Sequence, residues 1–269
     1  MPESFDLPYA IPLGKAVNII AFHPIGLVIL DKPEGTLSVP NKPEDFHKTI
    51  LKAKFKKKDE AYVWFDSAQQ QRFFYICHRL DSPTSGLLIG TLNQELAVEI
   101  RQLFKTRKIH KEYMAVVSGI PKGQSGQWSD RLKLNKSGGQ LRTRVSGGGD
   151  EAKADWKIVK QSQNPPLSLL SLKPATGRTH QLRIQTSHRG HGIIGDRTYG
   201  DFKLNSRLKK ELGITRMLLH AYRITIDADN LLGSPFRFFA ESPLPKAFTQ
   251  LFDNGRSGDT MPRFPKRTA

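Results

Sequence analysis

Short apolar runs that end in turns constrain the fold of this chain more than any other feature of its sequence. Residues 27–30 form one run and stop at the turn of residues 31–35, and residues 87–92 form another directly after the turn of residues 82–86. Runs of this length between turn residues are typical of buried strands. Further strand-like runs cover residues 111–119, 167–172, 180–185 and 217–226. Because few helical patterns lie between them, the sequence predicts an α+β fold with a mixed or antiparallel sheet.

One segment between these runs has the pattern of an amphipathic helix. Asn93 is a favourable N-cap residue, and apolar residues at the spacing of one helix face follow it: Leu96, Ile100, Leu103 and Phe104. Residues 41–77 are mixed in composition, and we expect a helix or a surface excursion there. Residues 122–150 combine glycine, serine and basic residues, which is typical of long loops or a twisted hairpin.

The charge of the chain is strongly positive and uneven. The formal net charge is +17, and residues 101–216 hold 24 basic against 8 acidic side chains, whereas the rest of the chain holds 18 against 17. A lysine-rich run such as residues 52–58 is typical of a solvated face, but a surplus of this size indicates a polyanionic partner. Nucleic acid is the partner that we expect, with an anionic membrane or an acidic protein as alternatives.

Cysteine content and hydropathy exclude several classes of protein. Cys77 is the one cysteine of the sequence, so neither a disulfide framework nor a thiolate metal site is expected. It precedes His78, but adjacent residues of an extended segment point to opposite faces, which disfavours a Cys–His catalytic pair. The sequence has no signal-peptide pattern and no run near the roughly 20 apolar residues of a membrane span. We therefore expect a soluble cytoplasmic protein.

The tetrapeptide His78-Arg79-Leu80-Asp81 lies directly before the turn that leads into the apolar run 87–92. A carboxylate beside an arginine, on a rigid loop at the mouth of a strand, is a candidate nucleophile or general acid/base. Alternatively, Asp81 caps the turn by accepting hydrogen bonds from backbone amides. Motifs further along the chain favour the first interpretation, because they supply partners for the carboxylate.

Three further segments complete the pattern. They are LDKPEGTLSVP at residues 30–40, KEYMAVVSG at residues 111–119, and GRTHQLRI at residues 177–184, which continues through His191 to Gly200. Together with HRLDSPTSG, and in this order, they resemble the RluA branch of the pseudouridine synthases from about residue 27 to about residue 220. The resemblance implies a mixed, largely antiparallel sheet with flanking helices and loops around a central cleft.

The resemblance also implies the activity and its catalytic residues. Family members isomerise uridine in RNA to its C-glycoside without a cofactor or a metal, and Asp81 matches their essential carboxylate. An ionised carboxylate in a water-poor site needs an opposite charge, and Arg183 matches that partner. We expect residues 181–185 to form a strand on which Arg183 faces away from Leu182 and Ile184. Tyr113 matches the tyrosine that lies against the target base.

Four further residues are candidate RNA contacts: Arg79, Lys111, Arg178 and His180. In the family, the arginine at the position of Arg79 fills the gap left by the extruded uridine. Three histidines near the third motif could suggest a metal site, but their spacing fits no zinc pattern, and neither cysteine nor acid completes one. We therefore expect no metal, and for the histidines we expect structural hydrogen bonds or phosphate contacts.

The sequence and the resemblance together predict three parts of the chain. Residues 1–24 are an N-terminal extension, residues 25–252 the catalytic domain, and residues 253–269 a basic, disordered tail, with no N-terminal S4 module. The expected partner is ribosomal or transfer RNA, and the expected state is a monomer. A non-catalytic RNA-binding protein is the alternative, and a metal-dependent nuclease is disfavoured because clustered acids are missing. Basic residues of the segment 122–150 should lie around the cleft, namely Lys133, Lys136, Arg142 and Arg144.

Overall fold

The computed structural model describes residues 7–137 and 140–252. Within this part of the chain, thirteen strands join in one sheet. The first six are β1 (Asn18–His23), β2 (Leu27–Lys32), β3 (Lys54–Lys56), β4 (Ala61–Phe65), β5 (Gln71–Ile76) and β6 (Ser85–Thr91). The others are β7 (Ile109–Ser118), β8 (Ser125–Ser137), β9 (Gln140–Val145), β10 (Asp150–Gln163), β11 (Pro166–Pro174), β12 (Leu219–Leu231) and β13 (Ser234–Glu241). The helices are η1 (Pro43–Lys48), α1 (Gln94–Lys105), α2 (Gln181–His188), α3 (Phe202–Leu212) and α4 (Lys246–Thr249).

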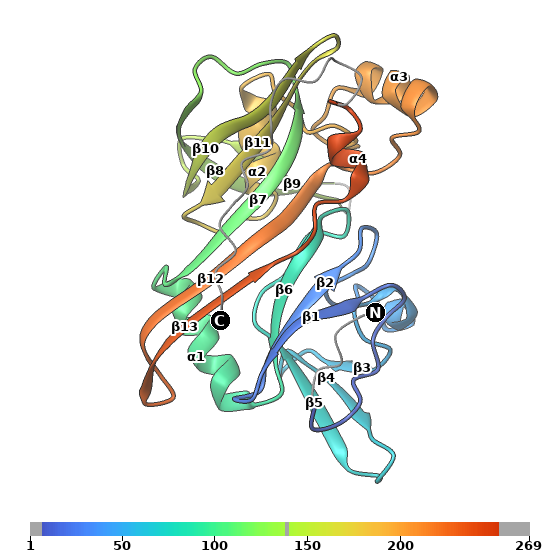
Figure 1. Cartoon of the computed structure of the whole chain (residues 1–269), viewed down its shortest axis with the longest axis vertical. Coiled ribbons are helices and arrows are strands. Elements are labelled where there is room, and N and C mark those ends of the chain that lie inside the picture. The colour runs from blue at the N-terminus through green and yellow to red at the C-terminus, as the bar shows by residue number, and fades with distance from the viewer. Residues whose placement is uncertain (1–6, 138–139, 253–269) are drawn as a thin grey trace.

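The sheet is mixed and largely antiparallel, as the sequence predicts. Its strands follow the order β3-β4-β5-β6-β12-β7-β11-β10-β8-β9, while β1 and β2 pair beside β6 and β13 pairs with β12. The long strands β7 and β12 run through the middle of the molecule and connect its two ends (Figure 1). Among the paired strands of the described residues, β6 and β12 form the one parallel pair. The fold class is therefore α+β with a mixed sheet.

Alternation along β7 places apolar side chains on both faces of the sheet. Ala115 and Val117 pack into one cluster with Trp128 and Trp156, whereas Met114 and its neighbour Val116 pack into another with residues of α3 and α4. The predicted alternation over residues 111–119 is thus confirmed. The sheet therefore has an apolar core on each side. The first half of β7, which includes Lys111 and Tyr113, is less buried than the second half.

Helix α1 matches its sequence pattern closely. The Asn93 side chain accepts a hydrogen bond from the Leu96 amide at 3.1 Å, which caps the helix. Leu96 and Ile100 are buried against the sheet, and Leu103 and Phe104 pack at the edge of the same cluster. The helix therefore covers one face of the sheet beside β5, β6 and β12.

One expectation about local structure is incomplete and another is wrong. Residues 41–77 contain the short helix η1 and also the strands β3, β4 and β5, because alternating aromatic residues of β4 and β5 pack on the sheet despite the many lysines nearby. Residues 181–185 belong to α2 and not to a strand. The alternation of Leu182, Arg183 and Ile184 resembled a strand, but all three side chains are buried on different sides of a short helix.

The other predicted segments have mixed outcomes. Residues 18–23, which we placed in an N-terminal extension, form β1 and pair with β2. For the segment 122–150 the sequence predicts long loops or a twisted hairpin, and the segment contains the β8–β9 hairpin. The predicted disordered tail at residues 253–269 lies outside the described residues.

Gly86 allows the loop that carries Asp81 to join the centre of the sheet. It has a φ of 106°, which favours glycine, and a Cβ at this position would lie 2.3 Å from the Ala221 carbonyl oxygen. The close approach occurs where β6 pairs with β12, at His220 opposite Ser85 and Ala221 opposite Gly86. Since Ala221 also pairs with Tyr113 of β7, this junction brings the loop next to that strand.

Candidate active site

A cleft of about 1310 Å³ opens beside the loop between β5 and β6. Residues of this loop, of the start of β7, and of the segment from the end of β11 into α2 form its walls. All seven residues that the sequence predicts for catalysis or RNA binding line it: Arg79, Asp81, Lys111, Tyr113, Arg178, His180 and Arg183. Tertiary folding thus gathers motifs that are far apart in the sequence into one site.

Backbone hydrogen bonds fix the loop that carries Asp81. The Thr84 amide donates to the Asp81 carbonyl at 3.0 Å and closes a turn. On the other side, the Ser38 hydroxyl donates to the Leu80 carbonyl at 2.9 Å and accepts from the Leu80 amide at 3.0 Å. Among the described residues, no backbone amide donates to the Asp81 carboxylate, which instead contacts Arg183. The carboxylate is therefore directed into the cleft and does not cap the turn.

A fully buried lysine supports this loop from behind. The Lys32 ammonium donates to the carbonyl oxygens of Pro33, Thr36 and Ser82 at 3.0, 2.8 and 3.1 Å. Burial lowers the pKa of Lys32 to about 7, although the Asp81 carboxylate acts in the opposite direction. Lys32 thus joins the turn after β2 to the residue that follows Asp81. The sequence suggested only a turn here, because a lysine is rarely expected to be fully buried.

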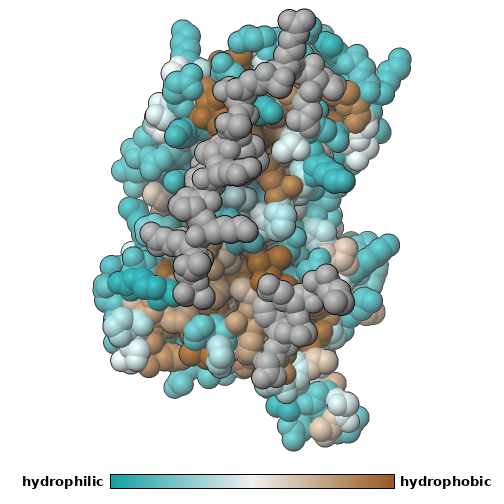
Figure 2. Space-filling view, viewed as in Figure 1, coloured by the Kyte–Doolittle hydropathy of each residue, from teal (hydrophilic) through white to brown (hydrophobic). Residues whose placement is uncertain are grey.

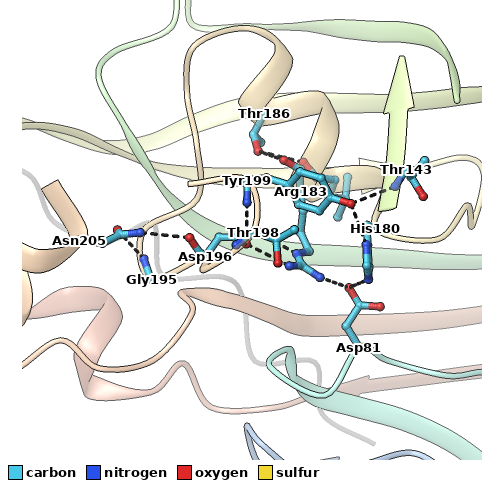
Figure 3. A network of polar contacts seen from close by, with 11 residues as sticks. Asp81, Thr143, His180, Arg183, Thr186, Gly195, Asp196, Thr198, Tyr199 and Asn205 are labelled. Carbon is cyan, nitrogen blue, oxygen red and sulfur yellow. Dashed lines mark hydrogen bonds and ion pairs between the residues drawn. The ribbon is translucent and has the colours of Figure 1, made fainter. Parts of the chain in front are cut away.

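Arg183 lies between two carboxylates. Its Nη1 donates to Asp81 Oδ2 at 3.0 Å, while its Nε and Nη2 donate to the two oxygens of Asp196 at 2.7 and 3.0 Å (Figure 3). The Arg183 side chain is 6% exposed and the Asp81 side chain 27% exposed. The predicted partnership of Asp81 and Arg183 is present in the structure, although Arg183 comes from a helix and not from a strand.

Asp196 is a site residue that the sequence did not single out. It is almost completely buried, and its Oδ1 also accepts from the Thr198 and Tyr199 amides at 2.8 and 3.1 Å. Burial alone would raise the pKa of Asp196, but the hydrogen bonds and charge of Arg183 outweigh burial and hold that pKa below its ordinary value. The bidentate contact fixes the guanidinium plane, so that Nη1 points at Asp81.

His180 lies on the other side of the Asp81 carboxylate. Its Nε2 is 3.7 Å from Asp81 Oδ2, and its Nδ1 is 3.0 Å from the Tyr199 hydroxyl (Figure 3). Burial lowers the pKa of His180, although the Asp81 carboxylate acts in the opposite direction. The residue precedes α2 with a φ of 56°. This left-handed backbone turns the side chain toward Asp81 as the chain enters the helix.

Tyr113 and Lys111 form the β7 wall of the cleft. Burial, together with the negative charge of Asp81, raises the pKa of Tyr113 above its ordinary value of 10.0, so the phenol is neutral at physiological pH. The Lys111 ammonium lies 5.4 Å from the centre of the Phe104 ring, and burial lowers its pKa. An aromatic ring and a basic side chain, two residues apart on β7, thus line the same cleft as Asp81.

Arg79 and Arg178 stand at the rim of the cleft. Arg79 is exposed and forms an ion pair with Glu60 at 3.0 Å. Arg178 donates from Nε to the Glu151 carbonyl at 3.1 Å, and its Nη1 lies 3.5 Å from an Asp150 carboxylate oxygen. Their existing partners are exposed acids or a backbone carbonyl, so both arginines are accessible to an anionic ligand, and their contact with RNA stays a prediction.

The basic hairpin β8–β9 packs on α2, and its described basic residues do not line the cleft. Lys133 and Arg144 are exposed and face each other across the two strands. The Thr143 amide donates to the Tyr199 hydroxyl at 3.0 Å, which connects the hairpin to the network around Arg183. The side chains of Lys136 and Arg142 lie outside the described residues. A role of this hairpin in RNA binding remains a prediction.

Two alternative chemistries have no structural support in the described residues. Burial raises the pKa of the Cys77 thiol to about 12, and burial lowers the pKa of His78 to about 3, while His78 Nε2 accepts from the Ile89 amide at 3.0 Å. A Cys–His nucleophile is therefore disfavoured. In residues 7–137 and 140–252, no three His, Cys, Asp or Glu side chains are grouped as a metal site would require. The absence of a metal from the reaction itself stays a prediction.

Comparison with known proteins agrees with this site. A family model described as RNA pseudouridylate synthase matches residues 26–188. The ribosomal large subunit pseudouridine synthase C of Haemophilus influenzae is 29% identical over 236 residues, which cover 84% of this chain and 66% of that protein. The tRNA pseudouridine synthase C of Haemophilus ducreyi is 35% identical over 214 residues, which cover 72% of this chain and 79% of that protein.

A solved structure supports the fold. The human RNA pseudouridylate synthase domain containing 4 superposes with a TM-score of 0.61 over 86% of this chain and 90% of that chain, at 22% sequence identity. The matched region includes the motifs around Asp81, Tyr113 and Arg183, which meet in the cleft. The chain therefore belongs to the RNA pseudouridylate synthase family, in its RluA-type branch.

Proposed function

We propose that this protein is an RNA pseudouridine synthase that isomerises uridine in ribosomal or transfer RNA. The observation that carries the proposal is the hydrogen bond of 3.0 Å between Arg183 Nη1 and Asp81 Oδ2, in a cleft that Tyr113 also lines. Membership of the family favours this function over that of a non-catalytic RNA-binding protein. The relatives named above act on ribosomal and on transfer RNA, so both remain candidate substrates.

The reaction needs no oxidant or reductant. The bond between ribose C1′ and uracil N1 breaks, a bond between C1′ and uracil C5 forms, C5 loses a proton and N1 gains one. We assign to Asp81 the attack on the ribose or on the base that lets uracil detach, and to Arg183 the counter-charge that favours an ionised carboxylate. The ring of Tyr113 would hold the flipped base by stacking while the base turns.

The remaining candidate residues would bind the RNA. We assign Lys111, Arg178 and His180 to contacts at the cleft and Arg79 to the gap that the flipped uridine leaves. Residues 25–252 are the proposed catalytic domain, acting as a monomer in the cytoplasm. In the described part of the chain, no helix has the length and apolarity needed to cross a membrane.

Asp81→Asn is the direct test of the proposed chemistry. We expect a folded protein that makes no pseudouridine, because the neutral amide cannot act as the nucleophile. Pseudouridine in RNA incubated with each protein would be mapped after chemical derivatisation, and circular dichroism would report the fold. Turnover of the variant at the wild-type rate would contradict the role of Asp81. Mapping pseudouridines in total RNA from a strain without the protein would identify the target uridine.

A further inference from the structure

Strands β3, β4 and β5 form one end of the thirteen-stranded sheet, outside the cleft, and we call this end the β3–β5 sheet. They occupy the end of the strand order, with β3 as the edge strand. The β4–β5 hairpin projects away from the rest of the protein (Figure 1), and mostly hydrophilic side chains cover its projecting part (Figure 2). The catalytic assignment above uses none of the residues of this sheet.

The strand register places two lysines and two phenylalanines on one face of this sheet. Paired residues of antiparallel strands point to the same face. Lys54 pairs with Val63, Val63 pairs with Phe73, and Phe65 lies two residues beyond Val63. Lys56 lies two residues beyond Lys54 and therefore also shares the face. We call Lys54, Lys56, Phe65 and Phe73 the β3–β5 platform.

The β3–β5 platform exposes both an aromatic surface and positive charge. Phe65 is 62% exposed, and the Lys56 ammonium lies 5.6 Å from the centre of the half-buried Phe73 ring. Phe65 and Phe73 are diagonal neighbours, whose Cα atoms are roughly 7–8 Å apart in such a pair. Within residues 7–137 and 140–252, no carboxylate forms an ion pair with Lys54 or Lys56. The positive charge is therefore available to a phosphate.

The opposite face of the same strands makes the platform rigid. Tyr62 and Phe74 are fully buried there, in a core cluster with residues of β2 and β6. The Tyr62 hydroxyl donates to the Ser38 carbonyl at 3.0 Å, which ties this sheet to the segment that supports the catalytic loop. Lysines on an edge strand also prevent pairing with other chains, but that role does not require an exposed aromatic ring beside them.

An ion pair connects the β3–β5 platform to the rim of the cleft. Glu60 directly precedes Ala61, which pairs with Lys56, and its carboxylate contacts Arg79 at 3.0 Å and Arg101 at 3.5 Å. The Ile76 amide donates to the Glu60 carbonyl at 2.9 Å. Because Arg79 lines the cleft, the Glu60 carboxylate links the rim of the cleft to the first residues of β4, beside the platform.

We propose that the β3–β5 platform binds unpaired RNA nucleotides that flank the target uridine. Exposed aromatic rings on a sheet stack with bases, and neighbouring lysines contact the phosphates between them. Stacking requires unpaired bases, so the platform selects single-stranded RNA over duplex RNA. The inference rests on the proposed function in one respect, namely that the bound RNA contains the target uridine. The binding of RNA by the platform can be tested separately, because affinity is measured without turnover.

The test compares two variants with the same change in charge and in exposed aromatic surface. The platform variant is Lys54→Ala/Lys56→Ala/Phe65→Ala. The control variant is Phe202→Ala/Lys209→Ala/Lys210→Ala on α3, where Phe202 is 59% exposed and both lysines are exposed. Helix α3 lies at the opposite end of the molecule from β4 and β5 (Figure 1). Affinity would be measured for a short fluorescent oligouridylate and for an oligoadenylate–oligouridylate duplex, over a range of salt concentrations.

The platform variant should bind the oligouridylate about tenfold more weakly than wild type, because it lacks a base-stacking ring. Two lost phosphate contacts should reduce the slope of log affinity against log salt by about 1.4. The control variant should bind like wild type, and the platform variant should lose less affinity for the duplex than for the oligouridylate. Equal losses in the two variants, or equal losses for the two RNAs, would overturn the inference. If wild type makes no pseudouridine but these binding differences appear, the proposed function fails and the platform stands.

Discussion

Replacing Arg183 by methionine would remove the counter-charge of Asp81, but it would also leave Asp196 without its partner. Asp196 is 1% exposed and would keep hydrogen bonds only from the Thr198 and Tyr199 amides. Removing one member of a buried ion pair costs about 3–5 kcal/mol, a large part of the roughly 5–15 kcal/mol that stabilises a typical domain. We therefore expect Arg183→Met to lose turnover and to lower the free energy of unfolding by about 3–5 kcal/mol.

A second substitution separates these two effects. In Arg183→Met/Asp196→Asn, the amide oxygen of asparagine can still accept from the Thr198 and Tyr199 amides, and position 196 no longer carries an uncompensated charge. Most of the lost stability should return, because an uncompensated buried charge is the main cost. Turnover should stay lost, because Asp81 still has no guanidinium beside it. RNA affinity should change little in either variant, since other basic groups contact the phosphates.

Urea unfolding would measure stability, and pseudouridine formation on saturated complex in a single turnover would measure the chemistry. Recovery of turnover in the double variant would refute the reasoning, because Arg183 would then act only by neutralising Asp196. Arg183 would instead be a docking residue if the single variant lost RNA affinity and converted bound RNA at the wild-type rate.

Three further substitutions test other parts of the site. Tyr113→Phe should keep base binding and Tyr113→Ala should lose it, because stacking needs only the ring; equal losses, measured with a uridine-containing oligonucleotide, would implicate the hydroxyl. Lys32→Met should leave three carbonyl acceptors without their donor, lowering the free energy of urea unfolding by about 1–3 kcal/mol and slowing single turnover. Neutralising the basic hairpin should flatten the salt dependence of RNA binding and leave single-turnover chemistry nearly intact; an unchanged slope would show that these charges face bulk solvent. The hairpin residues are Lys133, Lys136, Arg142 and Arg144.

The residues at the cleft could be predicted because each belongs to a short local motif. Asp81 and Arg183 are 102 positions apart, and no periodicity in the sequence implies their contact. The resemblance to a family supplied the pairing, and the alternation of β7 correctly placed Tyr113 and Lys111 on one face. Short motifs thus identify the candidate residues of the site, whereas contacts between distant segments of the sheet determine how those residues are arranged.

The errors of sequence interpretation have a common physical cause. Helix α2 is buried on several sides, so it lacks the single apolar face by which a helix is recognised. It also begins after His180 without a side-chain cap, which removes the usual start signal. In residues 41–77, lysines of the edge strand obscured the alternation of β4 and β5. Helix and strand patterns are recognised when one face of an element is apolar and the other is polar. Helix α2 is buried on several sides and so lacks a polar face, whereas lysines beside β4 and β5 hide the apolar face of those strands.

The charges of Asp81, Asp196, Arg183 and Lys32 balance when Lys32 is protonated. The three carbonyl acceptors of Lys32 match the three donors of an ammonium group, and in that form Lys32 and Arg183 oppose the carboxylates of Asp81 and Asp196. Burial lowers the pKa of Lys32 to about 7, so this balance is lost as the pH rises above that value. A neutral cluster is less costly to bury than one with an excess charge. Under the proposed function, the attraction for RNA phosphates would come from basic groups that line the cleft outside this cluster, namely Arg79, Lys111 and Arg178. The cluster could then stay close to neutral while the cleft binds a polyanion.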